Sequence, residues 1–212
     1  MKVLSIILLA CMSMTYVYSQ DLKEIKLNAP DKTRGSAFMK ALAERKSARE
    51  YDARPLSLQD LSDLLWAANG VNREDGHRTA PSASNKQDID IYAILPDGAY
   101  LYDAPSHVLK PIAKGDYRGL VAGSQDFVKT AAVCLVLVSD LAKHGDPAAE
   151  QSKITGALDA GIVNQNINVF CSAVGLTNVP RTTMDKDELR KVLKLTDAQL
   201  PMINNVLGYP KK

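Results

Sequence analysis

An uninterrupted apolar run at residues 131–138 constrains the fold of this 212-residue chain more than any other feature. The run reads Ala-Ala-Val-Cys-Leu-Val-Leu-Val, which is rich in strand-forming residues and short for a helix. A strand that is apolar on both faces belongs in the interior of a sheet. We therefore expect this run to form a central strand of a β-sheet.

A hairpin signature lies upstream of this strand. Residues 89–95 and 99–102 are mainly apolar and are separated by Pro96-Asp97-Gly98, which favours a turn. Residues 202–209 are predicted to form the last strand. The polar residues 20–34 are expected to form an extended arm.

Helical periodicity marks several segments between the strands. Ser57 is predicted to cap one helix, with Asp60 three residues on and Gly70 at its end, and Asp185 with Glu188 predicts a capping box on another. The expected helices cover residues 36–46, 58–69, 117–126 (weakly), 153–175 and a segment after Asp185. The apolar side of the longest one is expected to comprise Ile154, Ala157, Leu158, Gly161, Ile162, Ile167, Phe170 and Cys171. Helices and strands mixed around one sheet indicate an α+β fold.

Residues 1–19 have the composition of a secretory signal peptide. Lys2 precedes a short apolar core, and small residues precede an expected cleavage site after Ser19. The apolar core is too short to span a bilayer. A lipoprotein acylated at Cys11 is the main alternative, and an ordinary buried first helix is the other. We expect an exported, periplasmic protein whose residues 20–212 form one domain.

The composition is that of an ordinary globular protein. Hydrophobic residues make up 46% and charged residues 24%, and the formal charge of +2 falls to +1 without Lys2. No basic run indicates a nucleic-acid partner. Cys134 and Cys171 are expected to be small buried residues, no spacing requires a disulfide, and no Cys/His cluster predicts a metal. The three histidines, His77, His107 and His144, are expected at the surface.

Residues 45–49, Arg-Lys-Ser-Ala-Arg, end the first expected helix. Two guanidinium groups on either side of a hydroxyl group can hold a phosphate dianion through charge-assisted hydrogen bonds. A basic helix end is also common as a solvated surface. This segment therefore predicts a phosphate site only in combination with others.

Two further segments suit a flat ligand. Residues 79–87, Thr-Ala-Pro-Ser-Ala-Ser-Asn-Lys-Gln, combine small residues with amide side chains that match a ring edge, although a flexible loop is the simpler interpretation. Residues 175–185 leave the long helix and enter a capped one, so they are expected to present backbone N–H groups that stabilise an electron-rich ring atom. Together with residues 45–49, they supply what flavin mononucleotide (FMN) needs.

In this order, the segments resemble the nitroreductase family. The matching motifs are Arg45 to Arg49, Pro81 to Gln87, Asp159 to Leu176, Val179-Pro180 to Asp185, and the terminal Leu207 to Lys212. The resemblance covers residues 36–212, and residues 98–116 are similar to the branch that includes azoline-oxidising dehydrogenases. It implies a nitroreductase-like α+β fold with a central, mixed, mostly antiparallel sheet flanked by helices. It also implies an intertwined homodimer that shares two FMN sites.

The resemblance implies a set of cofactor-binding residues. The phosphate and ribityl end of FMN would be held by Arg45, Lys46, Ser47 and Arg49, with Lys211 adding a charge. The loop that reaches the ring from the partner subunit would use Pro81, Ser82, Ala83, Asn85 and Gln87. Pro180, Thr182 and Thr183 would line the ring, with the Thr182 backbone N–H near its N5 atom. No side chain is expected to act as a general acid or a nucleophile.

Two departures from the family pattern affect this site. Arg181-Thr182-Thr183 follows the Val-Pro pair, where the family often has an acidic residue or a glycine. Asp88-Ile89 replaces the Pro-Trp pair that usually follows the glutamine of the loop. The polarity around N5 and the stacking of substrate over the flavin therefore do not follow from the family.

The implied activity is a ping-pong transfer of hydride from NADH or NADPH, through FMN, to a small nitroaromatic or quinone-like acceptor. Export favours an alternative, an FMN-dependent dehydrogenase that oxidises a peptide or a small metabolite. A non-enzymatic flavin-binding protein is the third interpretation. The presence of Arg45, Ser47, Arg49 and Asn85 argues against it.

Overall fold

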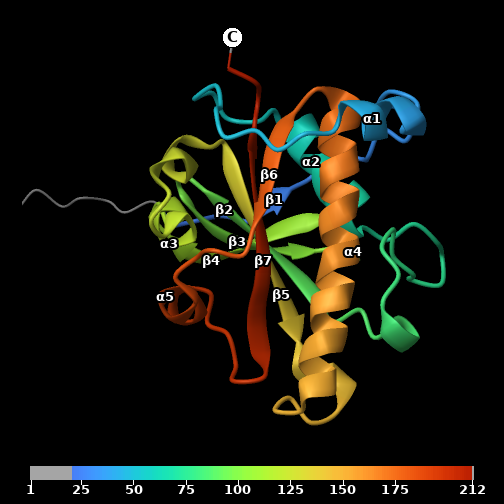
Figure 1. Cartoon of the computed structure of the whole chain (residues 1–212), viewed down its shortest axis with the longest axis vertical. Coiled ribbons are helices and arrows are strands. Elements are labelled where there is room, and N and C mark those ends of the chain that lie inside the picture. The colour runs from blue at the N-terminus through green and yellow to red at the C-terminus, as the bar shows by residue number, and fades with distance from the viewer. Residues whose placement is uncertain (1–20, 212) are drawn as a thin grey trace, which may run out of the picture.

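Figure 1 shows a computed structural model of the chain, which describes residues 21–211. The expected signal peptide, with Cys11, lies outside the described residues. One seven-stranded sheet has the order β1-β4-β3-β2-β5-β7-β6 within the described part. Its strands are β1 (Ile25–Lys26), β2 (Ile89–Leu95), β3 (Gly98–Asp103), β4 (Val108–Lys114), β5 (Val133–Asp140), β6 (Thr177–Arg181) and β7 (Gln199–Gly208). The helices are α1 (Phe38–Glu44), α2 (Leu58–Asn69), α3 (Arg118–Ala122), α4 (Glu150–Val174) and α5 (Lys186–Val192).

The strand predicted from the apolar run is β5, and it lies inside the sheet between β2 and β7. Its residues 133–138 are fully buried. Because strand side chains alternate between faces, Leu135 and Leu137 join a core with α2 and α4, whereas Cys134 and Val136 join a second core with α3 and α5. The predicted central strand is confirmed. Both cysteines are buried and free, and they form no disulfide with each other.

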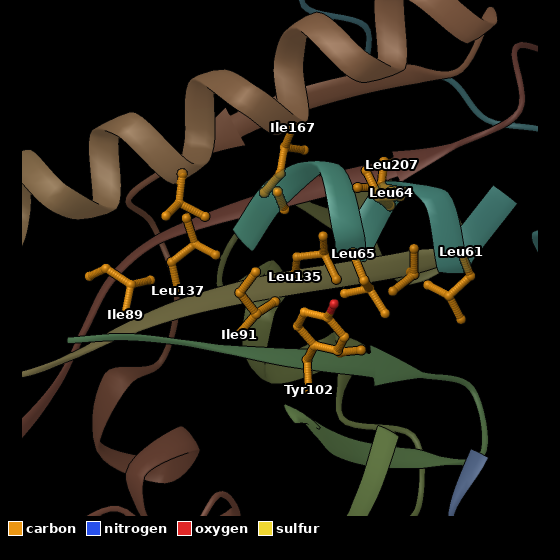
Figure 2. Packing of buried hydrophobic residues seen from close by; sticks show 14 of the residues in the cluster. Leu61, Leu64, Leu65, Ile89, Ile91, Tyr102, Leu135, Leu137, Ile167 and Leu207 are labelled. Atoms are coloured by element: carbon orange, nitrogen blue, oxygen red, sulfur yellow. The ribbon is translucent and has the colours of Figure 1, made fainter. Parts of the chain in front are cut away.

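Figure 2 shows the larger of the two cores. Leu64 and Leu65 of α2 and Ile167 of α4 pack over Leu135 of β5. At the far end of the same contact, Gly156 lets α4 approach β5, because a Cβ there would lie 2.9 Å from Ser139 Cβ. The long helix and the central strand are therefore held in direct contact.

The predicted hairpin, the last strand and the helix caps are found in the structure. Gly98 pairs with Leu95 across the β2–β3 turn, and the Ser57 side chain accepts a hydrogen bond from the Asp60 N–H, 3.0 Å away. The capping box at α5 is only half formed. Asp185 accepts from the Glu188 N–H, but the Glu188 carboxylate pairs with Lys191 at 2.6 Å instead of reaching back.

Strands β4 and β6 were not expected, and the short strand β1 was expected only as part of an extended arm. β4 and β6 each contain a proline, Pro111 and Pro180, which argues against strand structure in a sequence. β6 is the edge strand, and β1 pairs with β4 only at Val108 and Leu109, so neither proline interrupts a ladder on both sides. All pairings between the named strands are antiparallel, where a mixed, mostly antiparallel sheet was expected.

The predicted apolar side of α4 is confirmed only in its C-terminal half, where Ile167 and Cys171 are buried in the core. Ile154, Leu158 and Ile162, expected on the core side, are exposed by 46%, 64% and 37%. The face toward the sheet instead buries polar residues, namely Ser152, Asp159, Asn164 and Asn168. An exposed apolar stripe of this kind is a candidate contact surface.

The arm before α1 is extended, as expected. β1 pairs with β4, and the next residues are tied to α2 by hydrogen bonds from the Asn28 N–H to Ser62 Oγ and from the Asp31 N–H to Asp63 Oδ1. Among residues 21–211, no helix has both the length and the apolar character needed to cross a membrane.

Candidate functional site

Residues 45–49 follow α1 and lie against the end of α4 and the start of β6. The Ser172 hydroxyl of α4 donates to the Ala41 carbonyl at 2.7 Å. Ser47 forms a parallel bridge with Asn178, and the Ala48 N–H donates to the Asn178 carbonyl at 3.0 Å. The basic segment is therefore positioned by backbone bonds to β6, the strand that begins the third predicted segment.

The C-terminal tail joins the same place. Tyr51 pairs with Pro210 in an antiparallel bridge, and the Asp52 N–H donates to the Tyr209 carbonyl at 3.0 Å. Lys211 follows directly and is exposed. Three of the segments identified in the sequence thus converge here, around a cavity of about 190 Å³ lined in part by Lys46, Thr177 and Pro210.

The polar side chains of the basic segment, residues 45–49, form no hydrogen bonds or ion pairs with the described part of the protein. Lys46, Ser47 and Arg49 are exposed and Arg45 is half-buried. Among the described residues, none of these four side chains has a hydrogen-bond or ion-pair partner. Cationic and hydroxyl groups held in place by backbone bonds, with their own donors uncommitted, can bind an anion from solution.

Pro180 lies in β6, and Thr182 and Thr183 are exposed where the chain leaves it for α5. The side chain of Arg181, which lies between Pro180 and Thr182, points into the protein interior. Its guanidinium group donates to the carbonyls of Val121 and Ala122 at 3.0 and 2.9 Å, and also to Gln125 and Asn204. Burial lowers the pKa of this arginine. The departure at Arg181 therefore serves to attach α3 to β6.

The loop at residues 81–87 is rigidly built, although its composition also suited a flexible loop. Ser84, Asn85 and Gln87 all have φ between 48° and 53°, in the left-handed region that non-glycine residues rarely adopt. The Gln87 N–H donates to Ser82 Oγ at 2.8 Å, and its amide side chain contacts Arg78, the Gly76 carbonyl and Asn85. Gln87 therefore shapes the loop, and it leaves Ser84 and Asn85 exposed at the tip.

The loop is attached to the other half of α4. The Ala83 N–H donates to Asp159 Oδ2 at 2.9 Å. Asp159 and Ser172 are separated by about 20 Å along the helix axis, at a rise of about 1.5 Å per residue. Within one chain, the structure brings residues 45–49, 177–183 and 211 together and keeps the loop apart from them.

A buried charged cluster underlies the loop. Asp88 is fully buried, and its Oδ2 accepts from the Ser139 hydroxyl at 2.5 Å and lies 3.2 Å from His144 Nε2. Burial and the neighbouring Asp88 carboxyl group raise the pKa of Asp159. The prediction that His144 is a surface residue is wrong, because its side chain is only 7% exposed.

Four buried asparagines join the middle of α4 to the sheet. Asn178 of β6 donates to Asn168 of α4 at 2.6 Å and to Asn205 of β7 at 2.8 Å, and Asn205 donates to Asn164 of α4. These amides satisfy one another, as buried polar groups must. The network fixes the position of α4 relative to β6, and hence to residues 45–49.

Comparison with known proteins identifies the family. Residues 42–209 match the model of the nitroreductase family. The chain belongs to this family. A Methanocaldococcus jannaschii protein named as a nitroreductase is 29% identical over 189 residues, which is 85% of this chain and 90% of that protein. A Ralstonia eutropha crystal structure described as a nitroreductase is 36% identical with a TM-score of 0.83, over 89% of this chain and 90% of that one.

The structure of an NADPH:FMN oxidoreductase from Vibrio harveyi, complexed with NAD+, has a TM-score of 0.61 at 20% identity, over 82% of this chain and 69% of that one. At this identity, the likeness shows the fold alone. As a member of the nitroreductase family, the protein is an oxidoreductase. The non-enzymatic interpretation is therefore abandoned.

The cluster of Asp88, His144 and Asp159 was not expected from the sequence of this nitroreductase. These residues come from three distant segments, and no ligand spacing links them. One signal was present, because Asp88 is the first of the two residues that depart from the family pattern after Gln87. A charged residue at a position where the family usually has a proline can mark a local polar network.

Proposed function

We propose that this nitroreductase binds FMN and uses it to transfer electron pairs from NADH or NADPH to a small nitroaromatic or quinone-like acceptor. The observation that carries the proposal is the set of uncommitted donors on Arg45, Ser47 and Arg49, held beside β6. These groups fit a phosphate dianion in charge and in hydrogen-bonding capacity. The Vibrio harveyi neighbour, an NADPH:FMN oxidoreductase, supports the choice of cofactor.

In this proposal, Arg45, Lys46, Ser47 and Arg49 would hold the phosphate and ribityl end, and Lys211 would add a charge. Pro180, Thr182 and Thr183 would line the ring, with the Thr182 backbone N–H as the expected donor near N5. When bound, FMN supplies reversible two-electron chemistry that no side chain of the protein can provide. The protein binds and orients the ring and excludes water from it. The reaction cycle would be ping-pong if the electron donor and the electron acceptor occupied the same face of the flavin ring one after the other.

We further propose a homodimer in which each FMN contacts both subunits. A hydrophobic patch is exposed on two helices, and its exposure to water is unfavourable. It consists of Ile154, Leu158 and Ile162 on α4 with Phe38 and Met39 on α1. A second copy of the chain would cover it. The dimer would also bring the loop of one subunit, through Pro81, Ser82, Ala83 and Asn85, to the residues 45–49 of the other.

The test is the visible spectrum of purified residues 20–212 before and after addition of FMN. We expect bound flavin with shifted absorption bands, and at least tenfold weaker binding in Arg49→Ala. Arg73→Ala, at an exposed arginine outside the proposed site, is the matched control and should bind FMN normally. Unchanged FMN affinity in Arg49→Ala would contradict the phosphate assignment. A colourless protein that does not take up FMN would contradict the cofactor.

An exported FMN-dependent dehydrogenase is the second candidate, and the similarity of residues 98–116 to the azoline-dehydrogenase branch favours it. Anaerobic mixing of the FMN-loaded protein with NADH, NADPH or an azoline-containing peptide separates the two. Bleaching of the flavin by a nicotinamide nucleotide supports the reductase. Bleaching by the peptide alone supports the dehydrogenase.

A further inference from the structure

The buried cluster beneath the loop has the composition of a metal site. Asp88 directly precedes β2, His144 ends the short 3₁₀ turn Leu141–His144 after β5, and Asp159 lies on α4. One possible ligand atom from each residue lies within 4.8 Å of the other two. Three separate elements therefore bring an imidazole and two carboxylates to one point.

One atom of this cluster has no partner. In the described part of the chain, Asp88 Oδ1 is buried and makes no hydrogen bond, whereas His144 Nε2 is buried and lies 3.2 Å from Asp88 Oδ2. The Asp88 side chain is fully buried and that of His144 is 7% exposed. Since buried polar atoms are nearly always satisfied, the unpaired Asp88 Oδ1 indicates a bound group at this point.

The charge of the cluster also requires compensation. Asp88 and Asp159 are both buried, and among residues 21–211 the one ionisable side chain paired with either carboxylate is His144, which lies 3.2 Å from Asp88 and can supply at most one positive charge. The nearby Lys143 donates instead to the Gln87 carbonyl at 2.9 Å. Two adjacent buried carboxylates cannot both stay ionised without a cation or a shared proton.

We propose that Asp88, His144 and Asp159 bind one divalent transition-metal ion, with zinc as the best match. Imidazole nitrogen and carboxylate oxygen are both good zinc ligands, and three protein ligands leave a position for water. Zinc bonds of about 2.0–2.2 Å would draw the three side chains slightly closer together. The ion would neutralise the carboxylates and give Asp88 Oδ1 its missing partner.

The consequence of this site is to hold the loop at residues 81–87. Asp159 accepts from the Ala83 N–H, and Asp88 follows Gln87 directly in the chain. Both carboxylates therefore connect the ion to the backbone of the loop. The role in presenting the loop to FMN rests on the proposed function, but the metal site itself does not.

The experiment uses untagged, flavin-free protein that has been treated with a chelator and then titrated calorimetrically with ZnCl₂. We expect one Zn²⁺ per chain, a higher Tm with zinc, and little effect of Mg²⁺, which disfavours imidazole. Asp159→Asn and His144→Gln should weaken zinc binding at least tenfold. His77→Gln, at a half-buried histidine that pairs with Asp75, should not. Because no flavin is present, failure of this proposal is separate from failure of the proposed function.

Two outcomes would overturn the proposal. One is an absence of saturable zinc binding, and the other is equal binding in wild type and both variants; either would leave a proton shared between Asp88 and Asp159 as the explanation. If the variants do not fold, X-ray absorption of the zinc-loaded wild-type protein decides. Only nitrogen and oxygen ligands are expected, whereas sulfur ligands would place the metal at Cys134 or Cys171.

Discussion

The two ends of α4 present their polar groups in opposite ways. At the C-terminal end, the segment with Arg45, Ser47 and Arg49 is held by backbone bonds to β6, and these three side chains have no hydrogen-bond or ion-pair partner among the described residues. Toward the N-terminal end, Asp88 and Asp159 are buried and engaged with Ser139 and Ala83. The first end has donors available for a ligand, whereas the second uses its charges to hold a loop.

One chain can therefore carry two incomplete parts of a site. A binding group must keep its donors free of protein partners until the ligand arrives, and this costs little free energy when the donors are solvated by water. A loop with three residues at positive φ needs firm support, and buried charged hydrogen bonds provide it. Changes at the two ends should therefore have different effects on folding and on flavin binding.

The largest effect is expected from Asp88→Ala at the loop end. It leaves Ser139 and His144 without their partner in a buried place, so the free energy of unfolding should fall by about 3–5 kcal/mol. Urea denaturation of the flavin-free protein measures this. Asp126→Ala, at an exposed carboxylate paired only with Lys129, is the control and should change stability by less than about 0.5 kcal/mol. An equal loss of unfolding free energy in Asp88→Ala and Asp126→Ala would contradict the structural role given to the loop end of α4.

The next effect is expected from Leu158→Glu on the outward face of α4. If two copies pack through this stripe, a buried carboxylate would weaken their association at least a hundredfold, about 2.7 kcal/mol. Light scattering should then show a monomer at concentrations where the wild type is a dimer. Lys153→Glu, an exposed and already polar position on the same helix, is the control. A Leu158→Glu variant that remains a dimer would place the interface elsewhere.

Arg49→Ala should act on flavin binding and leave folding intact. Loss of one charge-assisted contact to phosphate should weaken FMN affinity about 10- to 100-fold. The unfolding free energy of the flavin-free protein should stay within about 0.5 kcal/mol of the wild type, because the side chain is exposed. Fluorescence quenching of FMN and urea denaturation measure the two quantities. A loss of stability instead of affinity would show that both ends of α4 are structural.

The smallest effect is expected away from both ends, at His107. Its ring contacts the Tyr102 hydroxyl and the Asn28 carbonyl, and burial lowers its pKa below 6.5. The unfolded state therefore binds a proton at His107 more readily than the folded state does. The contribution of neutral His107 to the free energy of unfolding is thus complete above about pH 6.5 and declines as the pH falls below that value. Between pH 7 and 5.5, His107→Gln should lose less stability than the wild type, with unchanged FMN affinity. An identical pH dependence in both proteins would exclude His107 as its source.

Local patterns in the sequence predicted the elements that local forces determine. The run at residues 131–138, the Pro96-Asp97-Gly98 turn and the Ser57 cap each need only neighbouring residues, and each was found. The strands β4 and β6 were missed because Pro111 and Pro180 disfavour strands, and only the pairing of distant segments reveals that they lie at or near an edge. Tertiary structure decided these cases.

The candidate site divides in the same way. The basic segment and the loop were recognisable as motifs, and their order indicated the family. The burial of His144 and the polar inner face of α4 were not predictable, since they depend on which helix face meets the sheet. An apolar stripe predicts burial, but it does not say whether the cover comes from the same chain or from a second one.

The central claim, that each flavin site combines residues 45–49 of one subunit with the loop of the other, is tested most directly by mixed dimers. Arg49→Ala removes a phosphate contact, and Asn85→Trp at the exposed loop tip blocks the ring position; each homodimer should bind FMN poorly. A heterodimer of the two would collect both defects in one site and leave the other intact. We predict one FMN per heterodimer at wild-type affinity. Heterodimers without any high-affinity FMN would show that each site is built from a single chain.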